Sequence, residues 1–199
     1  MPLQTLCVFC ASAMGAQPEY REAAESLGHA LAERRIGLVY GGARVGLMGA
    51  VADTAMRHGG TVVGVIPRVL VDREVSNHGL TELHVVDTMH TRKALMAERA
   101  DAFLILPGGY GTFEEMFEIL TWQSIGLHTK PVCLLNVRGF YDGLLAFLDT
   151  CVHEGVLRPA ARANLLVAQT VETALQMLAD GVGQVDAERV ATVNGGPHL

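Results

Sequence analysis

Charged residues are scarce in this sequence, and only two of them are lysines, Lys93 and Lys130. Asp, Glu, Lys and Arg make up 18% of the 199 residues, and the net charge is −6 at pH 7. No segment gathers basic residues. The pair Arg34 and Arg35 lies at the expected end of a helix, where cations complement the helix dipole. We therefore expect no nucleic-acid partner.

Long apolar runs are absent as well. No run approaches the ~20 residues that a membrane-spanning helix needs. Glycine and charge interrupt the apolar N-terminus within about twenty residues, which is untypical of a signal peptide. Half of the residues are nevertheless hydrophobic, enough for one domain with a sizeable core. We expect a soluble, cytoplasmic protein that meets no membrane.

Cysteine and histidine patterns give no sign of a disulfide framework or a metal site. Cys7 and Cys10 have C-x-x-C spacing, but side chains three apart on a strand point to opposite faces. Cys133 and Cys151 stand alone among apolar residues, so all four read as buried small hydrophobes. The eight histidines include no H-x-x-x-H or H-E-x-x-H spacing, so we expect no metal.

Apolar strands and amphipathic helices alternate along the whole chain, which predicts parallel βαβ units. We therefore expect an α/β, Rossmann-like, doubly wound parallel sheet with helices on both faces. One domain would cover residues 1–180, followed by a partly disordered C-terminal tail, 181–199. The segment 68–82 shows no regular pattern. The expected strands are 3–10, 37–40, 61–66, 83–86, 102–106, 131–137 and 165–168, and the expected helices are 20–34, 47–58, 89–100, 113–125, 140–154 and 171–179.

The segment from Leu104 to Glu115 combines a strand end, three glycines and a helix start. Glycine lets a backbone approach a phosphate closely, and a helix N-terminus offers N–H groups and a positive dipole. The segment therefore predicts an anion site. Alternatively, Thr112 and Glu115 form a capping box that only satisfies the helix start. Neither the Walker A loop nor the dinucleotide spacing G-x-G-x-x-G is present.

Glycine-rich loops also follow Cys10 and Tyr40. In a doubly wound sheet, ligands bind beyond the carboxyl ends of the strands, at a topological switch point. All three loops are expected at strand carboxyl ends. We therefore expect them to converge on one crevice.

Several motifs at matching distances resemble one family. The sequence PGGYGTFEE resembles the PGGxGTxxE signature of the LONELY GUY (LOG) family, and the segment from Met89 to Lys93 is similar to its MHxRK motif. The loops at 8–12 and 40–49 resemble the first two loops of the family. The similarity covers residues 3–180. It implies a homodimeric cytokinin riboside 5′-monophosphate phosphoribohydrolase that acts on a purine nucleoside 5′-monophosphate without a cofactor.

The resemblance also implies the site residues. Glu115 would supply a carboxylate beside the developing ribosyl cation, and Arg92 would stabilise charge, because arginine is a poor proton donor. The backbone of residues 109–112 would hold the phosphate. Alternatively, Arg92 and Lys93 are solvated charges, Glu74 is an exposed loop carboxylate and Thr121 an ordinary helical threonine. The implied substrate-binding residues are Glu74, Arg92, Lys93, Gly109, Tyr110, Gly111, Thr112, Phe113, Glu114, Glu115 and Thr121.

The helix expected from Phe113 onward is apolar on more than one side. Such a helix lies either deep in a monomer core or in a homodimer interface, and the resemblance favours the homodimer.

Alternatives to the implied activity remain. They are an AMP nucleosidase without a cytokinin role, or a module that binds AMP without turnover. A lysine decarboxylase, the description that relatives often carry, would use pyridoxal phosphate and a Schiff-base lysine. We reject it, because the chain has only Lys93 and Lys130, and Lys130 directly precedes the strand-starting Pro131.

Overall fold

The computed structural model describes residues 2–71 and 79–194, with side chains up to residue 185. Within these described residues, seven parallel strands form one sheet in the order β4-β3-β2-β1-β5-β6-β7. The strands are β1 Thr5–Phe9, β2 Gly37–Tyr40, β3 Val62–Pro67, β4 Glu82–Val86, β5 Ala102–Ile105, β6 Val132–Leu135 and β7 Leu165–Ala168. The expected α/β, doubly wound fold is confirmed. Strand order reverses between β1 and β5, so the topological switch point lies there.

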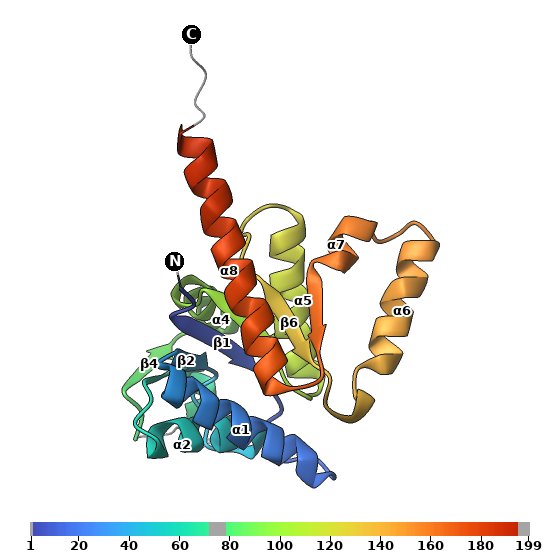
Figure 1. The fold of residues 1–199 in the computed structure, drawn as a ribbon. Helices are drawn as coiled ribbons and strands as arrows, with labels where there is room; N and C mark the ends of the chain where they lie inside the picture. Colours follow the sequence, from blue (N-terminus) through green and yellow to red (C-terminus); the bar gives the residue numbers. More distant parts are fainter. Residues whose placement is uncertain (1, 72–78, 195–199) are drawn as a thin grey trace.

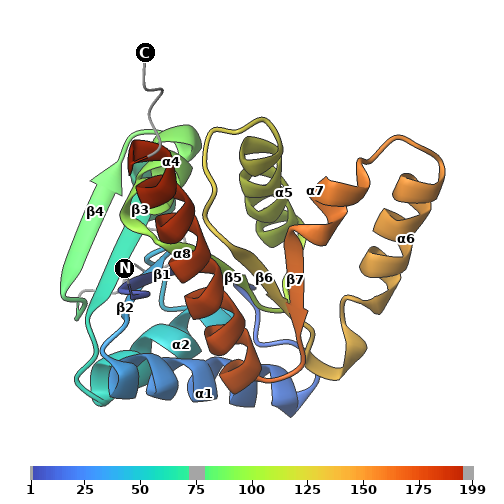
Figure 2. The same cartoon turned by 45° about the horizontal axis from the view of Figure 1, so that its top comes forward.

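Helices cover both faces of this sheet (Figure 1). Helices α1, α2 and α8 pack on one face, and α4, α5 and α6 on the other. At the β7 edge, α6 and α7 lie beside the sheet, and β4 forms the opposite edge (Figure 2). The helices are α1 Pro18–Arg34, α2 Gly46–Arg57, α3 Arg68–Val71, α4 Met89–Arg99, α5 Tyr110–Ser124, α6 Asp142–His153, α7 Pro159–Ala163 and α8 Val171–Asn194, with a 3₁₀ turn η1 at Val137–Gly139.

The central strand β1 is buried on both faces, as its continuous apolar run predicts. Leu6, Val8 and Cys10 enter the core under α1, α2 and α8, whereas Cys7 and Phe9 enter the core under α4, α5 and α6. The prediction that the thiols of Cys7 and Cys10 diverge is confirmed. All four cysteines are free.

Several predicted boundaries are wrong. The segment 68–82 was expected to be irregular but contains α3, and α7 lies where no element was expected. Helix α5 begins at Tyr110, before the predicted start. Helix α8 does not end at residue 179 but continues to Asn194, because Gly181 serves close packing rather than termination. A Cβ at Gly181 would lie 2.8 Å from Cβ of Pro131. Of the predicted, partly disordered tail 181–199, residues 181–194 are helical, and residues 195–199 lie outside the described residues.

Across residues 2–71 and 79–194, no helix combines the length and the apolar character that a membrane crossing requires.

Candidate active site

The loops after β1 and β5 meet in a cavity of about 260 Å³ beside the switch point. The loop after β1 supplies Cys10, Ala11, Ser12 and Ala13, α2 supplies Met48, α4 supplies Arg92, and the start of α5 supplies Gly109, Tyr110, Gly111, Thr112 and Glu115. The predicted convergence of the loops is therefore confirmed for the loops after β1 and β5. The loop after β2 reaches the same place through Gly41, whose carbonyl accepts a hydrogen bond from Nη2 of Arg92 at 3.3 Å.

Backbone hydrogen bonds hold these loops together. The N–H of Ala11 donates to the carbonyl of Pro107 at 3.1 Å, and the carbonyl of Ala11 accepts from the N–H of Leu47 at 3.1 Å. Gly46 has φ +57°, and a Cβ there would lie 2.3 Å from the carbonyl carbon of Ser12. Only glycine therefore allows the loops after β1 and β2 to approach this closely.

The glycine loop leads directly into a helix whose start has no side-chain cap. Gly109 occupies the N-cap position of α5, and no side chain hydrogen-bonds to the N–H groups there. The first N–H groups of a helix have no acceptor within the helix. A Cβ at Gly109 or Gly111 would meet nothing within 4 Å, whereas one at Gly108 would lie 2.1 Å from Oγ1 of Thr112. Gly109 and Gly111 thus leave open space in front of the helix end, as an anion requires.

The alternative capping box is wrong. In a capping box Thr112 would be the N-cap and Glu115 the third helical residue. Instead the helix begins two residues before Thr112, so Glu115 lies more than one turn inside it. Its carboxylate therefore does not cap the helix start, and Glu115 lines the cavity.

Arg92 is buried and held by the carboxyl ends of two strands. Its Nε donates to the carbonyl of Val65 at 3.1 Å, and Nη2 donates to Gly41. Nη1 lies 3.8 Å from Oε1 of Glu115, and the two side chains are 6% and 10% exposed. The backbone carbonyls fix the guanidinium plane, so its remaining edge faces the carboxylate and the cavity. Charges in such a dry site act more strongly than in water.

The thiol of Cys10 shares this electrostatic environment. Burial raises the pKa of Cys10 strongly, the charge of Glu115 raises it further, and Arg92 lowers it. Cys10 therefore lines the cavity as a neutral thiol and is not a thiolate nucleophile.

Comparisons with known proteins agree with this geometry. Residues 48–178 match the family described as "possible lysine decarboxylase". The chain is 49% identical to the cytokinin riboside 5′-monophosphate phosphoribohydrolase LOG2 of Arabidopsis thaliana, over 91% of this chain and 85% of that protein. It is 50% identical to the cytokinin riboside 5′-monophosphate phosphoribohydrolase of Rhodococcoides fascians, over 86% and 87% of the two chains. The chain belongs to the LONELY GUY family.

Among solved structures, this LOG-family chain resembles the molybdenum cofactor binding protein of Rippkaea orientalis, with a TM-score of 0.69 and 21% identity over 90% of this chain and 98% of that one. The molybdenum cofactor carrier protein of Chlamydomonas reinhardtii gives a TM-score of 0.67 with 20% identity, over 91% and 99% of the chains. Identities this low support the shared fold alone.

The two lysines of the LOG-family chain are engaged away from the cavity lining. Nζ of Lys93 bonds a carboxylate oxygen of Glu114 and lies 3.0 Å from Oε2 of Glu118. Nζ of Lys130 donates to the carbonyl of Ala97 at 2.6 Å. Neither lysine lines the cavity. Their positions argue against a Schiff base there, whatever the family description says.

The other residues implied by the resemblance fall into two groups. Gly109, Tyr110, Gly111 and Thr112 line the cavity with Arg92 and Glu115. Lys93, Phe113, Glu114 and Thr121 do not line it: Phe113 packs edge-on against Tyr141, and Oγ1 of Thr121 donates to the carbonyl of Phe117 at 2.7 Å. Their substrate-binding roles stay predictions. Glu74 lies outside the described residues.

Five residues of the cavity lining were not among the predicted site residues: Cys10, Ala11, Ser12, Ala13 and Met48. The position of the first four at the end of β1, beside the switch point, is the signal that points to them. Tyr141 was also missed. Its hydroxyl donates to the carbonyl of Leu106 at 2.6 Å, which fixes the end of β5 directly before the glycine loop. No pattern in the sequence indicates that contact.

Proposed function

We propose that this chain hydrolyses the N-glycosidic bond of N6-modified adenosine 5′-monophosphates, the cytokinin riboside 5′-monophosphates, and also that of AMP. The products are the free base and ribose 5-phosphate. The observation that carries the proposal is the pairing of Arg92 and Glu115 beside the uncapped start of α5, in one cavity. The names and the near-50% identity of the relatives support it.

Each part of the cavity has a chemical task in this reaction. The N–H groups at the start of α5 hold the 5′-phosphate, which places the ribose over Glu115, one to two turns along the helix. Cleavage of the bond between C1′ and the base nitrogen develops positive charge on the ribose. The carboxylate of Glu115 stabilises that charge and accepts a proton from the attacking water. As the bond between C1′ and the base nitrogen breaks, the hydroxide portion of the water joins C1′, and the departing base takes up the proton that Glu115 received from the water.

Arg92 balances the charge of this site. Its guanidinium stays protonated and is a poor acid. It therefore positions Glu115 and stabilises negative charge on the phosphate or the departing base. The fixed hydrogen bonds to Val65 and Gly41 mean that little reorganisation accompanies the reaction.

The proposal includes a homodimer. On α5, Met116 and Ile119 are buried, whereas Phe117 is 40% exposed and Ile125 just beyond the helix is 65% exposed. A second copy of the chain would cover the exposed side chains of Phe117 and Ile125. The cytoplasm as its compartment stays a prediction.

A nucleotide panel tests the function. Isopentenyl-AMP, AMP, GMP and CMP, with the matching nucleosides, are incubated with pure protein, and the released base is measured. We expect cleavage of the adenine monophosphates and almost none of the nucleosides, since binding of the remote phosphate positions the sugar. Preference for isopentenyl-AMP supports the cytokinin role, and equal use of AMP supports a plain AMP nucleosidase. Comparable turnover of adenosine and AMP contradicts the phosphate site, and absence of any released base contradicts enzymatic activity.

A further inference from the structure

Neighbouring residues of α4 form ion pairs with neighbouring residues of α5. Arg92 faces Glu115, and the next residue, Lys93, bonds Glu114. Neighbouring residues on a helix point about 100° apart. One pair therefore faces the cavity, while the other lies on a different side of the contact between the helices.

Lys93 makes a second contact one turn farther along α5. Glu118 lies four residues after Glu114, so both carboxylates lie on one side of the helix. Oε2 of Glu118 is 3.0 Å from Nζ of Lys93. The Lys93 side chain is 3% exposed, and those of Glu114 and Glu118 are 54% and 21% exposed. Glu118 is thus the more buried of the two partners.

A buried ammonium group requires such partners. Burial alone would lower the pKa of Lys93, but the hydrogen bond to Glu114 and the negative charges of Glu114 and Glu118 outweigh it, and the pKa lies above its ordinary value. Lys93 therefore stays charged, and its charge is directed at α5 rather than at the cavity.

We propose that Lys93 and Glu118 are positioning residues, whose ion pair holds α5 against α4 so that Glu115 meets Arg92 at the cavity. The inference rests on the proposed function. It differs from the role that the family resemblance implies for Lys93, which is direct contact with the substrate. It also gives a task to Glu118, a residue outside the family motif and outside the cavity lining.

Substrate contact and positioning by Lys93 predict different effects of removing Glu118 on turnover. If Lys93 contacts the substrate, loss of Glu118 leaves that contact in place and turnover changes little. If the ion pair positions Glu115, loss of either partner misplaces the carboxylate, and loss of both is no worse than loss of one. Misplacement lowers kcat, whereas the phosphate site at the start of α5 and hence KM are largely kept.

The test compares Glu118→Leu, Lys93→Met and the double variant, with Lys93→Arg as the conservative change. Glu172→Leu is the matched control, because Glu172 of α8 pairs with Arg34 of α1 on the opposite face of the sheet. We expect Glu118→Leu and Lys93→Met each to lower kcat about tenfold or more with KM within about twofold, and the double variant to match the singles. Lys93→Arg should keep most of kcat, and Glu172→Leu all of it.

Either of two kinetic results overturns the inference. One is Glu118→Leu with kcat within about twofold of wild type, and the other is additive losses in the double variant. A wild-type protein that cleaves no nucleotide refutes the proposed function instead. A crystal structure of Glu118→Leu then still decides the positioning role. We expect Glu115 to move away from Arg92, and an unchanged Nη1–Oε1 separation of 3.8 Å overturns it.

Discussion

At the scale of single residues, the site depends on one buried charge pair whose members come from different helices. Arg92 has two backbone acceptors besides Glu115. The guanidinium is therefore fixed even when the carboxylate is neutralised, and a change at Glu115 tests the carboxylate rather than the packing around it. No capping role at the helix start competes with this interpretation, because Gly109 is the N-cap.

Glu115→Gln keeps the shape of the side chain but removes its charge. We expect a folded protein that still binds AMP and cleaves it more slowly, by a factor on the order of 10² or more, because the amide neither accepts the proton of water nor stabilises the ribosyl cation. Steady-state kinetics and circular dichroism check this. Glu172→Gln, at an exposed glutamate of α8, serves as the control. Turnover within about threefold of wild type removes Glu115 from the chemistry.

At the scale of elements, helix stability and open space for a ligand favour different residues at the start of α5. Glycine at the second helical position lowers helix stability relative to alanine. A Cβ at Gly111 would nevertheless meet nothing within 4 Å, so the fold does not require glycine there. Packing therefore does not explain the glycine at position 111, whereas the need for open space at a proposed ligand site does.

Gly111→Ala should therefore stabilise the fold and impair the enzyme. We expect the free energy of unfolding to rise by up to about 1 kcal/mol. KM for AMP should rise about tenfold, which corresponds to about 1.4 kcal/mol, since the methyl group would occupy the proposed phosphate site. The control is Gly143→Ala, at the second position of α6 with equally open space. It should bring a similar gain in stability with unchanged KM. An unchanged KM for Gly111→Ala contradicts the phosphate cradle.

The connection from α5 to β6 depends on a neutral histidine. Nε2 of His128 lies 3.0 Å from the carbonyl of Ile119, and Nδ1 accepts from the N–H of Lys130 at 3.1 Å. Burial chiefly lowers the pKa of His128, Lys130 lowers it too, and the bond to Ile119 opposes the shift. Below the ordinary value of 6.5 the unfolded chain therefore binds a proton that the folded chain resists, and stability falls as pH falls.

His128→Asn should reduce this acid sensitivity, because asparagine offers a donor and an acceptor but does not titrate. Urea unfolding midpoints at about pH 7.5 and about pH 5.5 measure it, a range in which histidine changes charge. We expect a smaller drop in the midpoint for the variant than for wild type. Equal drops in the two proteins would assign the sensitivity to other groups.

The sequence predicts the strands, the long helices and the meeting of the loops, because apolar periodicity and glycine positions are local signals. It fails at α3 and α7, which are only four and five residues long. Helices this short have little stability of their own and form through tertiary packing. Arg92 and Glu115 were recognisable from motifs, but the pairing of Lys93 with Glu118 was not. Which way a side chain points between two helices depends on how those helices pack.

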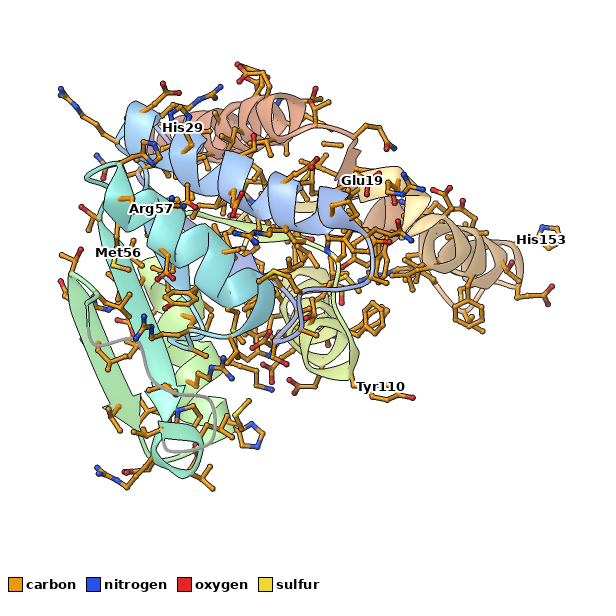
Figure 3. All side chains as sticks on the ribbon, turned by 90° about the horizontal axis from the view of Figure 1, so that it is seen from below. Glu19, His29, Met56, Arg57, Tyr110 and His153 are labelled. Atoms are coloured by element: carbon orange, nitrogen blue, oxygen red, sulfur yellow. The ribbon has the colours of Figure 1, made fainter. Side chains whose placement is uncertain are left out.

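At the scale of the whole molecule, α5 serves the site on one side and is exposed on another. Glu115 and Met116 are buried, whereas Phe117 is 40% exposed. Tyr110 borders the cavity at the helix start, where its side chain is 95% exposed and projects outward (Figure 3). Aromatic side chains are enriched in protein–protein interfaces relative to the rest of the surface. A second copy seated there would couple assembly to the geometry of the site.

Light scattering should therefore give a mass near twice 21.3 kDa at micromolar concentration. Phe117→Asp should weaken the dimer by roughly 30-fold or more, since loss of a central aromatic contact in an interface costs about 2 kcal/mol. In a single chain the same change replaces a half-exposed side chain and alters folding little.

Val69→Asp is the control, because Val69 on α3 is 62% exposed and lies on a different helix. It should leave the mass unchanged. A wild-type monomer with full activity contradicts the dimer. If instead Phe117→Asp yields a folded monomer with lowered kcat, the exposed face of α5 acts on the site through assembly.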